Sequence, residues 1–179
     1  EFKFAGFDAV IISGKSPSPV YLWIHDGQAE LRDAGHLWGR HTGDAERIIK
    51  DELGDDKIKI LQIGPAGENL VRYAAVIHDV NRAAGRNGLG ALMGSKNLKA
   101  VAVRGTTRVP VADRARLTAV AKWLGDNYAD LMSWATGPNG RATQNALGSL
   151  APKGGLPTRN FGKPIFDHPE LLSGARNYE

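Results

Sequence analysis

Cysteine is absent from the sequence, and its absence excludes two kinds of site. Disulfide bonds and thiolate-bound metal centres both require cysteine sulfur, so neither can form within these 179 residues. A run of about 18 or more apolar residues, as a membrane-spanning helix requires, is also missing. The first residues lack the pattern of a signal peptide. We therefore expect a cytoplasmic protein that does not span a membrane.

Charge and histidine are too sparse to indicate a function by themselves. The net charge of +4 comes from scattered residues, whereas nucleic-acid binding needs positive charge gathered on one face. We therefore expect no nucleic-acid partner. The five histidines show no informative metal-ligand spacing, which favours surface or hydrogen-bonded structural roles for them. No Ser/His/Asp arrangement for nucleophilic catalysis is recognisable.

Alternating apolar residues predict several strands in the first part of the chain. Val20–His25 alternates between two faces and is followed by Asp26-Gly27. This pair favours a hairpin, because a type I′ turn needs positive φ at both central residues. Further strands are predicted over residues 8–13, 28–32, 58–63, 71–77 and 100–103, with a turn over residues 64–69.

Helical periodicity predicts two helices. Thr42–Leu53 places its apolar residues on one face, with Thr42 or Asp44 as the N-cap and Gly54 as the C-terminal cap. A second helix is predicted after Asp113, which is placed to cap it, and extends to about residue 131. Beyond residue 135 the chain is rich in Gly, Pro and Asn and is predicted to be a loop with at most a short helical turn.

A change of composition near residues 106–112 predicts a domain boundary. Residues 1–108 hold the predicted strands and form a β-rich α+β domain, whereas residues 109–179 begin a helical domain. The chain does not start with methionine, and its first residues already resemble the inside of a domain. We therefore expect it to be a fragment of a longer protein.

Residues 81–99 carry the clearest functional signal. Arg82 and Arg86 supply planar, bidentate donors suited to phosphate. Glycines allow positive φ and close approach of a ligand, and successive backbone N–H groups in such turns form anion-binding concavities. The segment therefore predicts a phosphate-binding loop, with a tight structural loop and solvated arginines as the alternative. Its glycines are Gly85, Gly88, Gly90 and Gly94.

Two familiar glycine motifs do not fit this segment. A P-loop needs Gly-Lys followed by Ser or Thr, whereas the order here is Gly94-Ser95-Lys96. A dinucleotide-binding motif needs an acidic residue about 20 positions later, and no Asp or Glu occurs between Asp79 and Asp113. The loop over residues 64–69 is compatible with either a second ligand-facing loop or a plain turn.

Three motifs carry a resemblance to a known family. They are Arg82-Ala83-Ala84-Gly85-Arg86, the segment GLGALMGSKNLKA at residues 88–100 and the segment IGPAGEN at residues 63–69. Shorter matches lie at residues 4–8, 31–34 and 155–161. In this order and spacing they resemble the aldehyde ferredoxin oxidoreductase family, the tungsten- and molybdenum-pterin enzymes. The resemblance covers nearly the whole chain and is densest between residues 63 and 105.

The resemblance implies a fold, a cofactor and a reaction. Members of the family hold tungsten or molybdenum between two pyranopterins, beside a four-iron cluster, and oxidise aldehydes to carboxylic acids. The electrons pass to ferredoxin or to a dedicated electron-transfer subunit. Their N-terminal domain is β-rich, with a double-sheet base under the cofactor, and helical domains follow. This chain is similar to the second half of that base together with the opening of the next domain, and the parent protein is compatible with a homo-oligomer.

By the same resemblance, Arg82, Ala83, Gly85 and Arg86 match the positions that contact the pterin phosphates. The backbone carbonyl of Ala83 matches a ligand of a magnesium ion bridging those phosphates, and hard cations favour oxygen ligands. Asn87 stands where the family commonly has glycine. The thiolates that a four-iron cluster needs are absent, so we expect the cluster only in the parent protein and no aldehyde oxidation by this chain alone.

The residues alone also admit functions of other classes. The first alternative is a non-catalytic phosphate- or nucleotide-binding module that uses the same loop. The second is a basic nucleic-acid-binding domain, whose affinity would fall steeply with salt. The sequence leaves open which metal, which substrate and which electron acceptor the parent protein uses.

Overall fold

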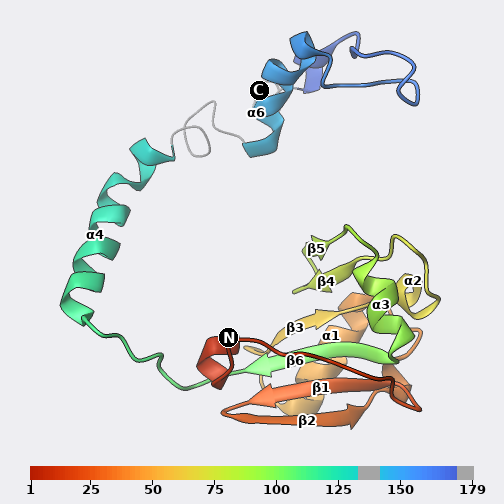
Figure 1. Ribbon diagram of the computed structural model, residues 1–179, viewed down its shortest axis with the longest axis vertical. Helices are drawn as coiled ribbons and strands as arrows, with labels where there is room; N and C mark the ends of the chain where they lie inside the picture. Colours follow the sequence, from red (N-terminus) through yellow and green to blue (C-terminus); the bar gives the residue numbers. More distant parts are fainter. Residues whose placement is uncertain (133–141, 173–179) are drawn as a thin grey trace. The chain divides into compact units, whose positions relative to one another are not determined.

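The computed structural model describes residues 1–132 and 142–172. It divides into two units, Glu1–Pro110 and Val111–Glu179 (Figure 1). The assignment of residues 1–108 to a cofactor-binding domain and of residues 109–179 to the start of a helical domain stays a prediction. Within the described residues, no helix combines the length and apolarity needed to cross a membrane.

The first unit is built on one mixed sheet, which has six strands in the described part of the chain. The strand order is β2-β1-β6-β3-β4-β5, with β1 and β6 parallel and every other neighbouring pair antiparallel. The α+β class is confirmed. The strands are β1 (Val20–His25), β2 (Gln28–Asp33), β3 (Lys59–Gln62), β4 (Val76–His78), β5 (Arg82–Ala84) and β6 (Leu98–Arg104).

Helices connect several of these strands, and further helices lie in the second unit. In the first unit they are η1 (Phe2–Ala5), η2 (Gly35–Leu37), α1 (Thr42–Leu53), α2 (Pro65–Glu68) and α3 (Leu89–Ser95). In the second unit they are α4 (Arg114–Leu131), α6 (Ala142–Leu150), η3 (Ala151–Lys153) and η4 (Pro169–Leu172).

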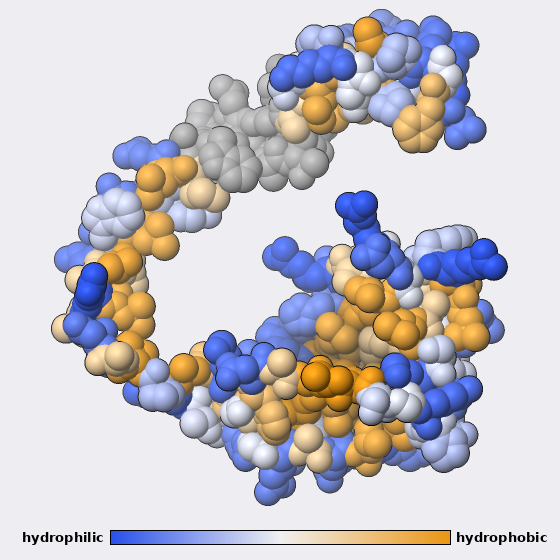
Figure 2. Space-filling model, in the orientation of Figure 1, coloured by the Kyte–Doolittle hydropathy of each residue, from blue (hydrophilic) through white to orange (hydrophobic). Residues whose placement is uncertain are grey.

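The two faces of the sheet are packed differently. Helix α1 covers one face, where a buried core gathers around Tyr21, Ile49 and Ile60 (Figure 1). On the opposite face, Leu22 and Ile24 pack with Ala5 of η1. Because side chains alternate along a strand, neighbouring residues of β1 feed these two separate cores. In Figure 2 the face opposite α1 presents a largely apolar surface.

The hairpin predicted at Asp26-Gly27 is confirmed. His25 pairs with Gln28, and Asp26 and Gly27 have φ of 41° and 82°, as a two-residue turn with both centres left-handed requires. The predicted C-terminal cap of α1 is also confirmed, since Gly54 has φ 68° and its N–H bonds to the Lys50 carbonyl at 2.8 Å. The N-cap prediction was wrong. His41 occupies that position and its side chain makes no capping bond.

The strand predicted over residues 8–13 was wrong. These residues have no regular secondary structure, and Ile11 is 95% exposed. Its β-branched composition suits a strand, but β-propensity reflects packing against neighbours, and this segment pairs with no strand in the described residues. The residue pattern of one segment does not indicate whether a partner strand is available elsewhere in the chain.

The segment between β3 and β4 also differs from its prediction. Residues 65–68 form helix α2 rather than a turn, with Pro65 at the first helical position, where its missing N–H costs nothing. The strand predicted over residues 71–77 is reduced to Val76–His78. Val71 N–H bonds to the Ala66 carbonyl and Ala74 N–H to the Val71 carbonyl, so turns use the backbone groups that a longer ladder would need.

In the second unit the helix predicted after Asp113 is confirmed. The Asp113 carboxylate accepts a hydrogen bond from Arg116 N–H at 2.9 Å, which is an N-terminal cap. The loop predicted beyond residue 135 was wrong for residues 142–150, which form α6. Residues 133–141 lie outside the described part of the chain.

Candidate functional site

The four residues predicted to bind phosphate lie on β5 and in the turn that follows it. Arg82 and Ala83 belong to β5, and Gly85 and Arg86 follow directly. All of residues 81–87 are exposed. Among the described residues, strand β5 lies at the edge of the sheet and pairs with β4 alone, so part of its backbone N–H and C=O groups has no partner strand there (Figure 1). We call residues 76–88, which span β4, β5 and this turn, the candidate hairpin.

The register of the candidate hairpin fixes which face of the sheet each side chain occupies. His78 pairs with Arg82, and Ile77 pairs with Ala83. Since directly opposed residues share a face and successive residues alternate, Arg82 lies on the same face as His78, whereas the Ala83 side chain lies on the other. The two arginines are therefore placed by different parts of the fold, Arg82 by the sheet and Arg86 by the turn.

The turn between β4 and β5 is held to the neighbouring strand by Asp79. Its N–H bonds to the Ile60 carbonyl at 3.1 Å, and its carboxylate accepts hydrogen bonds from Ile60 N–H at 3.4 Å and from Lys59 Nζ at 2.7 Å. Burial raises the pKa of Asp79, but the hydrogen bonds from Lys59 and from Ile60 N–H outweigh it, so the net pKa lies below its ordinary value. The ionised carboxylate of Asp79 therefore holds the candidate hairpin in place.

The same turn contains a strained residue. Asp79 and Val80 have φ of 45° and 61°. Asp tolerates the left-handed region, whereas a β-branched side chain there is an outlier that costs on the order of 1–2 kcal/mol. Val80 is 50% exposed, so packing compensates little of this cost. The bonds made by Asp79 hold the turn in place despite the strain.

The turn after β5 also uses left-handed residues. Asn87 and Gly88 both have φ 66°. Asn is among the non-glycine residues that adopt this conformation most readily, so Asn87 is compatible with it. A Cβ on Gly88 would overlap the Arg72 carbonyl oxygen, whereas a Cβ on Gly85 would meet no atom within 4 Å. Gly88 is therefore required for packing, and Gly85 lies in open space.

Two of the glycines assigned to a phosphate-binding loop have a different role. Gly90 and Gly94 are buried residues of helix α3. A Cβ on Gly90 would lie 2.5 Å from the Ala75 carbonyl oxygen, and one on Gly94 would overlap the Gly67 carbonyl oxygen. The prediction that they belong to a phosphate-binding loop was wrong. Instead, these glycines allow backbone contact between α3 and the segment containing α2. The predicted loop thus reduces to residues 85–88.

Arg82 and Arg86 have no anionic partner in the described part of the chain. The ion pairs found there use other arginines, among them Arg104 with Asp55 at 2.6 Å and Arg32 with Glu30 at 2.6 Å. Neither guanidinium forms an ion pair with any described carboxylate. Two exposed arginines four positions apart are therefore free to bind an external anion, and phosphate matches their planar donor geometry.

Side chains of the described residues provide no metal centre. No group of three or more His, Cys, Asp or Glu side chains among residues 1–132 and 142–172 is arranged to hold a metal ion. A metal at the candidate hairpin would need backbone carbonyls or groups from a cofactor. The free edge of β5 is where the hairpin can offer backbone oxygen ligands, and the Ala83 carbonyl predicted from the sequence belongs to this exposed strand.

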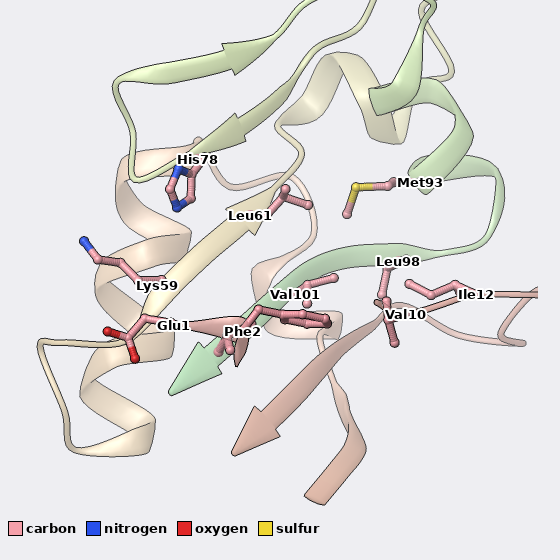
Figure 3. Close-up of a pocket in the computed structure, with 11 residues that line it drawn as sticks. Glu1, Phe2, Val10, Ile12, Lys59, Leu61, His78, Met93, Leu98 and Val101 are labelled. Carbon is pink, nitrogen blue, oxygen red and sulfur yellow. The ribbon is translucent and has the colours of Figure 1, made fainter. Parts of the chain in front are cut away.

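An apolar groove of about 590 Å³ lies on the sheet face opposite α1 (Figure 3). Leu61, Met93 and Val101 line it, and Lys59 and His78 lie at one end. Its volume suits a small organic ligand. However, Lys59 is already paired with Asp79, so the groove offers few free polar groups to orient one. The free arginines make the candidate hairpin the stronger binding site.

A buried ion pair that was not predicted from the sequence joins β6 to α2. The Lys99 side chain in β6 is fully buried, and its ammonium group contacts the carboxylate of Glu68 in α2, whose side chain is 3% exposed. Both residues lie within motifs that carried the family resemblance, but neither was assigned a role. A lysine in a strand and a glutamate in a turn are usually exposed, so nothing in the local sequence distinguished them.

Comparisons with known proteins agree with the resemblance read from the sequence. Residues 1–105 match the family model described as the aldehyde ferredoxin oxidoreductase N-terminal domain. The tungsten-containing aldehyde ferredoxin oxidoreductase of Thermococcus kodakarensis is 44% identical over 174 residues, which are 97% of this chain and 29% of that protein. The corresponding protein of Pyrococcus furiosus is 52% identical over 122 residues, covering 68% of this chain and 20% of that protein.

A solved structure is similar as well. The active-site complex of benzoyl coenzyme A reductase bound to 1,5-dienoyl-CoA matches with a TM-score of 0.67 and 42% identity. The match covers 70% of this chain and 19% of the other. The chain therefore spans less than a third of the length of these relatives.

Proposed function

Since this chain belongs to the aldehyde ferredoxin oxidoreductase family, we propose that its candidate hairpin binds the phosphates of a tungsten-pterin cofactor. In this proposal Arg82 and Arg86 donate hydrogen bonds to phosphate oxygens, and residues 83 and 85 lie against the same groups. The observation that carries it is the pair of exposed guanidiniums without an anionic partner in the described residues, beside an edge strand. The tungsten in the names of the relatives favours that metal over molybdenum.

The donor set fits a phosphate-bearing group. Hydrogen bonds to charged partners contribute about 1.5–3 kcal/mol each, so two arginines account for a large part of cofactor retention. Gly85 has open space around its α-carbon, which leaves room for a ligand close to the backbone. As part of the proposal, the Ala83 carbonyl would be an oxygen ligand of a magnesium ion at the phosphates, because Mg²⁺ favours oxygen ligands together with substrate or cofactor phosphates.

Binding and orientation are the role of this chain, and the bound tungsten-pterin group would supply the redox chemistry. The candidate hairpin fixes the phosphate end of the cofactor and so limits the orientations that its reactive end can adopt. The chain has no cysteine, so the ligands of a four-iron cluster must come from another part of the parent protein.

For the parent protein we propose aldehyde oxidation to a carboxylic acid, with electrons passed to ferredoxin or a dedicated subunit in the cytoplasm. The names of two similar relatives support this reaction. Substrate identity is a separate question, since a similar solved structure is a benzoyl coenzyme A reductase. A common platform for the cofactor is compatible with different substrates.

The test uses the full-length parent protein, purified with its cofactor, and the variants Arg82→Gln and Arg86→Gln. We expect each to contain markedly less tungsten and less releasable pterin per chain than the wild type. Arg47→Gln, an exposed arginine on α1, is the matched control and should leave both unchanged. Wild-type tungsten content in the double variant Arg82→Gln/Arg86→Gln would refute the proposal. A parent protein without tungsten or molybdenum would favour the non-catalytic phosphate-binding module instead.

A further inference from the structure

The buried pair Glu68–Lys99 joins three segments that are far apart in the sequence. The Lys99 ammonium group donates to the Glu68 carboxylate and to the Arg40 carbonyl oxygen, the latter at 2.9 Å. The second carboxylate oxygen of Glu68 accepts a hydrogen bond from Gly39 N–H at 2.7 Å. One ion pair therefore connects strand β6, helix α2 and the loop that leads into α1.

Lys99 occupies an irregular position in the sheet. Val20 pairs with Leu98 and Tyr21 pairs with Ala100, so the register between β1 and β6 shifts at this residue. Bulges of this kind redirect a side chain. Burying both charges removes their hydration, and a well-packed apolar pair of similar volume is often as stable or more so. Stability alone therefore explains the pair poorly, and its geometry suggests a positioning role.

Helix α2, which carries Glu68, is in direct backbone contact with helix α3. A Cβ on Gly67 would lie 2.8 Å from the Gly90 carbonyl oxygen, and one on Gly94 would overlap the Gly67 carbonyl oxygen. The Gly90 N–H bonds to the Ala74 carbonyl oxygen at 2.9 Å. No flexible side chain lies between these backbones at the glycines, so a displacement of α2 is passed on to α3 (Figure 1).

The turn after β5 leads directly into helix α3. Gly88 is the N-cap of α3, and a Cβ on it would overlap the Arg72 carbonyl oxygen. Residues 85–87, by contrast, are exposed. The position of Arg86 therefore depends on where α3 lies, and α3 is placed by α2.

We propose that Glu68 and Lys99 are a positioning pair, which fixes α2 to β6 and thereby holds the turn at residues 85–88 for phosphate binding. The role in cofactor binding rests on the proposed function. Neither residue contacts the phosphates. They act through α2 and α3 and set the distance between Arg86 in the turn and Arg82 on β5. Residues that orient ligand-binding groups in this way commonly alter affinity about 10–100-fold when they are changed.

The test compares Lys99→Met with the double variant Lys99→Met/Glu68→Gln in the full-length parent protein. The single variant leaves a buried carboxylate without its cation, so we expect a lower melting temperature. The double variant has no unpaired charge, so its melting temperature should recover towards that of the wild type. Its link to β6 is still absent, so its pterin content per chain should remain clearly below that of the wild type.

Hydrogen–deuterium exchange of a peptide covering residues 86–93 gives an independent readout. In the double variant its amides, including that of Gly90, should exchange faster than in the wild type, whereas amides near the C-terminal end of α1 should not change. The matched control is Lys50→Met/Glu46→Gln, which removes a Lys–Glu pair of 2.7 Å between two residues of α1. It should alter neither pterin content nor exchange at residues 86–93.

Three outcomes decide the proposal. Wild-type exchange at residues 86–93, or wild-type pterin content, in a folded double variant would overturn it. If the double variant does not fold, Lys99→Leu/Glu68→Gln takes its place, because it likewise removes both charges and leaves neither one buried without a partner. If Arg82→Gln/Arg86→Gln keeps its cofactor, the proposed function fails, and exchange alone then decides whether Glu68 and Lys99 position the turn.

Discussion

Asp79 and Lys59 form an ion pair of 2.7 Å that ties the turn of the candidate hairpin to strand β3. The Asp79 side chain is 22% exposed, and it also receives the Ile60 N–H. The pair therefore does more than neutralise a surface charge, because it fixes the strand that carries Arg82 against the rest of the sheet. Its consequences for stability can be measured as a function of pH.

Asp79→Asn is expected to destabilise the chain by about 0.5–1.5 kcal/mol at neutral pH, the range for an ordinary hydrogen bond, because solvent screens the charge of the half-exposed Lys59. Because the folded-state pKa of Asp79 lies below its ordinary value of 3.8, its stabilisation is present above that value. It is lost as the pH falls through the folded-state pKa. The difference in the free energy of unfolding between wild type and variant should therefore become smaller at acidic pH. Urea unfolding of the chain at several pH values measures it.

The Lys3–Asp8 pair is the control for this prediction. Its length is 2.6 Å, but its two side chains are 69% and 85% exposed. Exposed pairs contribute little to stability, so Asp8→Asn should leave the unfolding midpoint nearly unchanged at every pH. If Asp79→Asn and the wild type had the same free energy of unfolding at neutral pH, or if their difference increased at acidic pH, the role given to Asp79 would be contradicted.

Gly94→Ala is expected to destabilise the first unit, because the added Cβ overlaps the Gly67 carbonyl oxygen. Inserting a methyl group into such a contact costs about 1–3 kcal/mol. Gly43→Ala in α1 is the control, since its Cβ would meet no atom within 4 Å. Alanine is the better helix former there, so that variant should be neutral or slightly more stable. Thermal unfolding of both variants checks the prediction, and equal melting temperatures would contradict the close packing of α2 and α3.

Local patterns predicted those parts of the fold that depend on neighbouring residues. The Asp26-Gly27 turn, the Gly54 cap and the Asp113 cap each follow from backbone requirements within a few positions. The strand expected over residues 8–13 failed because it needed a partner elsewhere in the chain. Helix α2 was missed because Gly-Pro-Ala-Gly is compatible with both a turn and the start of a helix.

The candidate site was predicted only in part, for a related reason. Arg82 and Arg86 were identified because arginines among glycines are chemically distinctive. Gly90 and Gly94 were misassigned, since the same glycine spacing suits a ligand loop and close helix packing, and only the position of α2 distinguishes the two. The Glu68–Lys99 pair joins residues 31 positions apart, which no local pattern reveals.

Replacing Val80 with asparagine is expected to stabilise the candidate hairpin. Val80 has φ 61°, a region that asparagine tolerates and a β-branched residue does not. Since its side chain is 50% exposed, little packing is lost, and we expect a gain of about 0.5–1 kcal/mol. Val109→Asn, at an exposed position without positive φ, is the control and should bring no gain. A loss of stability in Val80→Asn would show that the valine makes contacts that outweigh its strain.

Arg82→Lys separates charge from geometry at the proposed phosphate site. Lysine keeps the positive charge but lacks the planar fork that binds two phosphate oxygens at once. Losing one hydrogen bond to a charged group, at about 1.5–3 kcal/mol, corresponds to roughly a 10–150-fold loss of affinity, and Arg82→Gln should lose at least as much. The rate of cofactor release from the full-length protein is followed by pterin fluorescence. We expect this rate to be lowest in the wild type, higher in Arg82→Lys and at least as high in Arg82→Gln. If Arg82→Lys released cofactor as slowly as wild type, charge alone would account for the role of Arg82, and bidentate binding would be excluded.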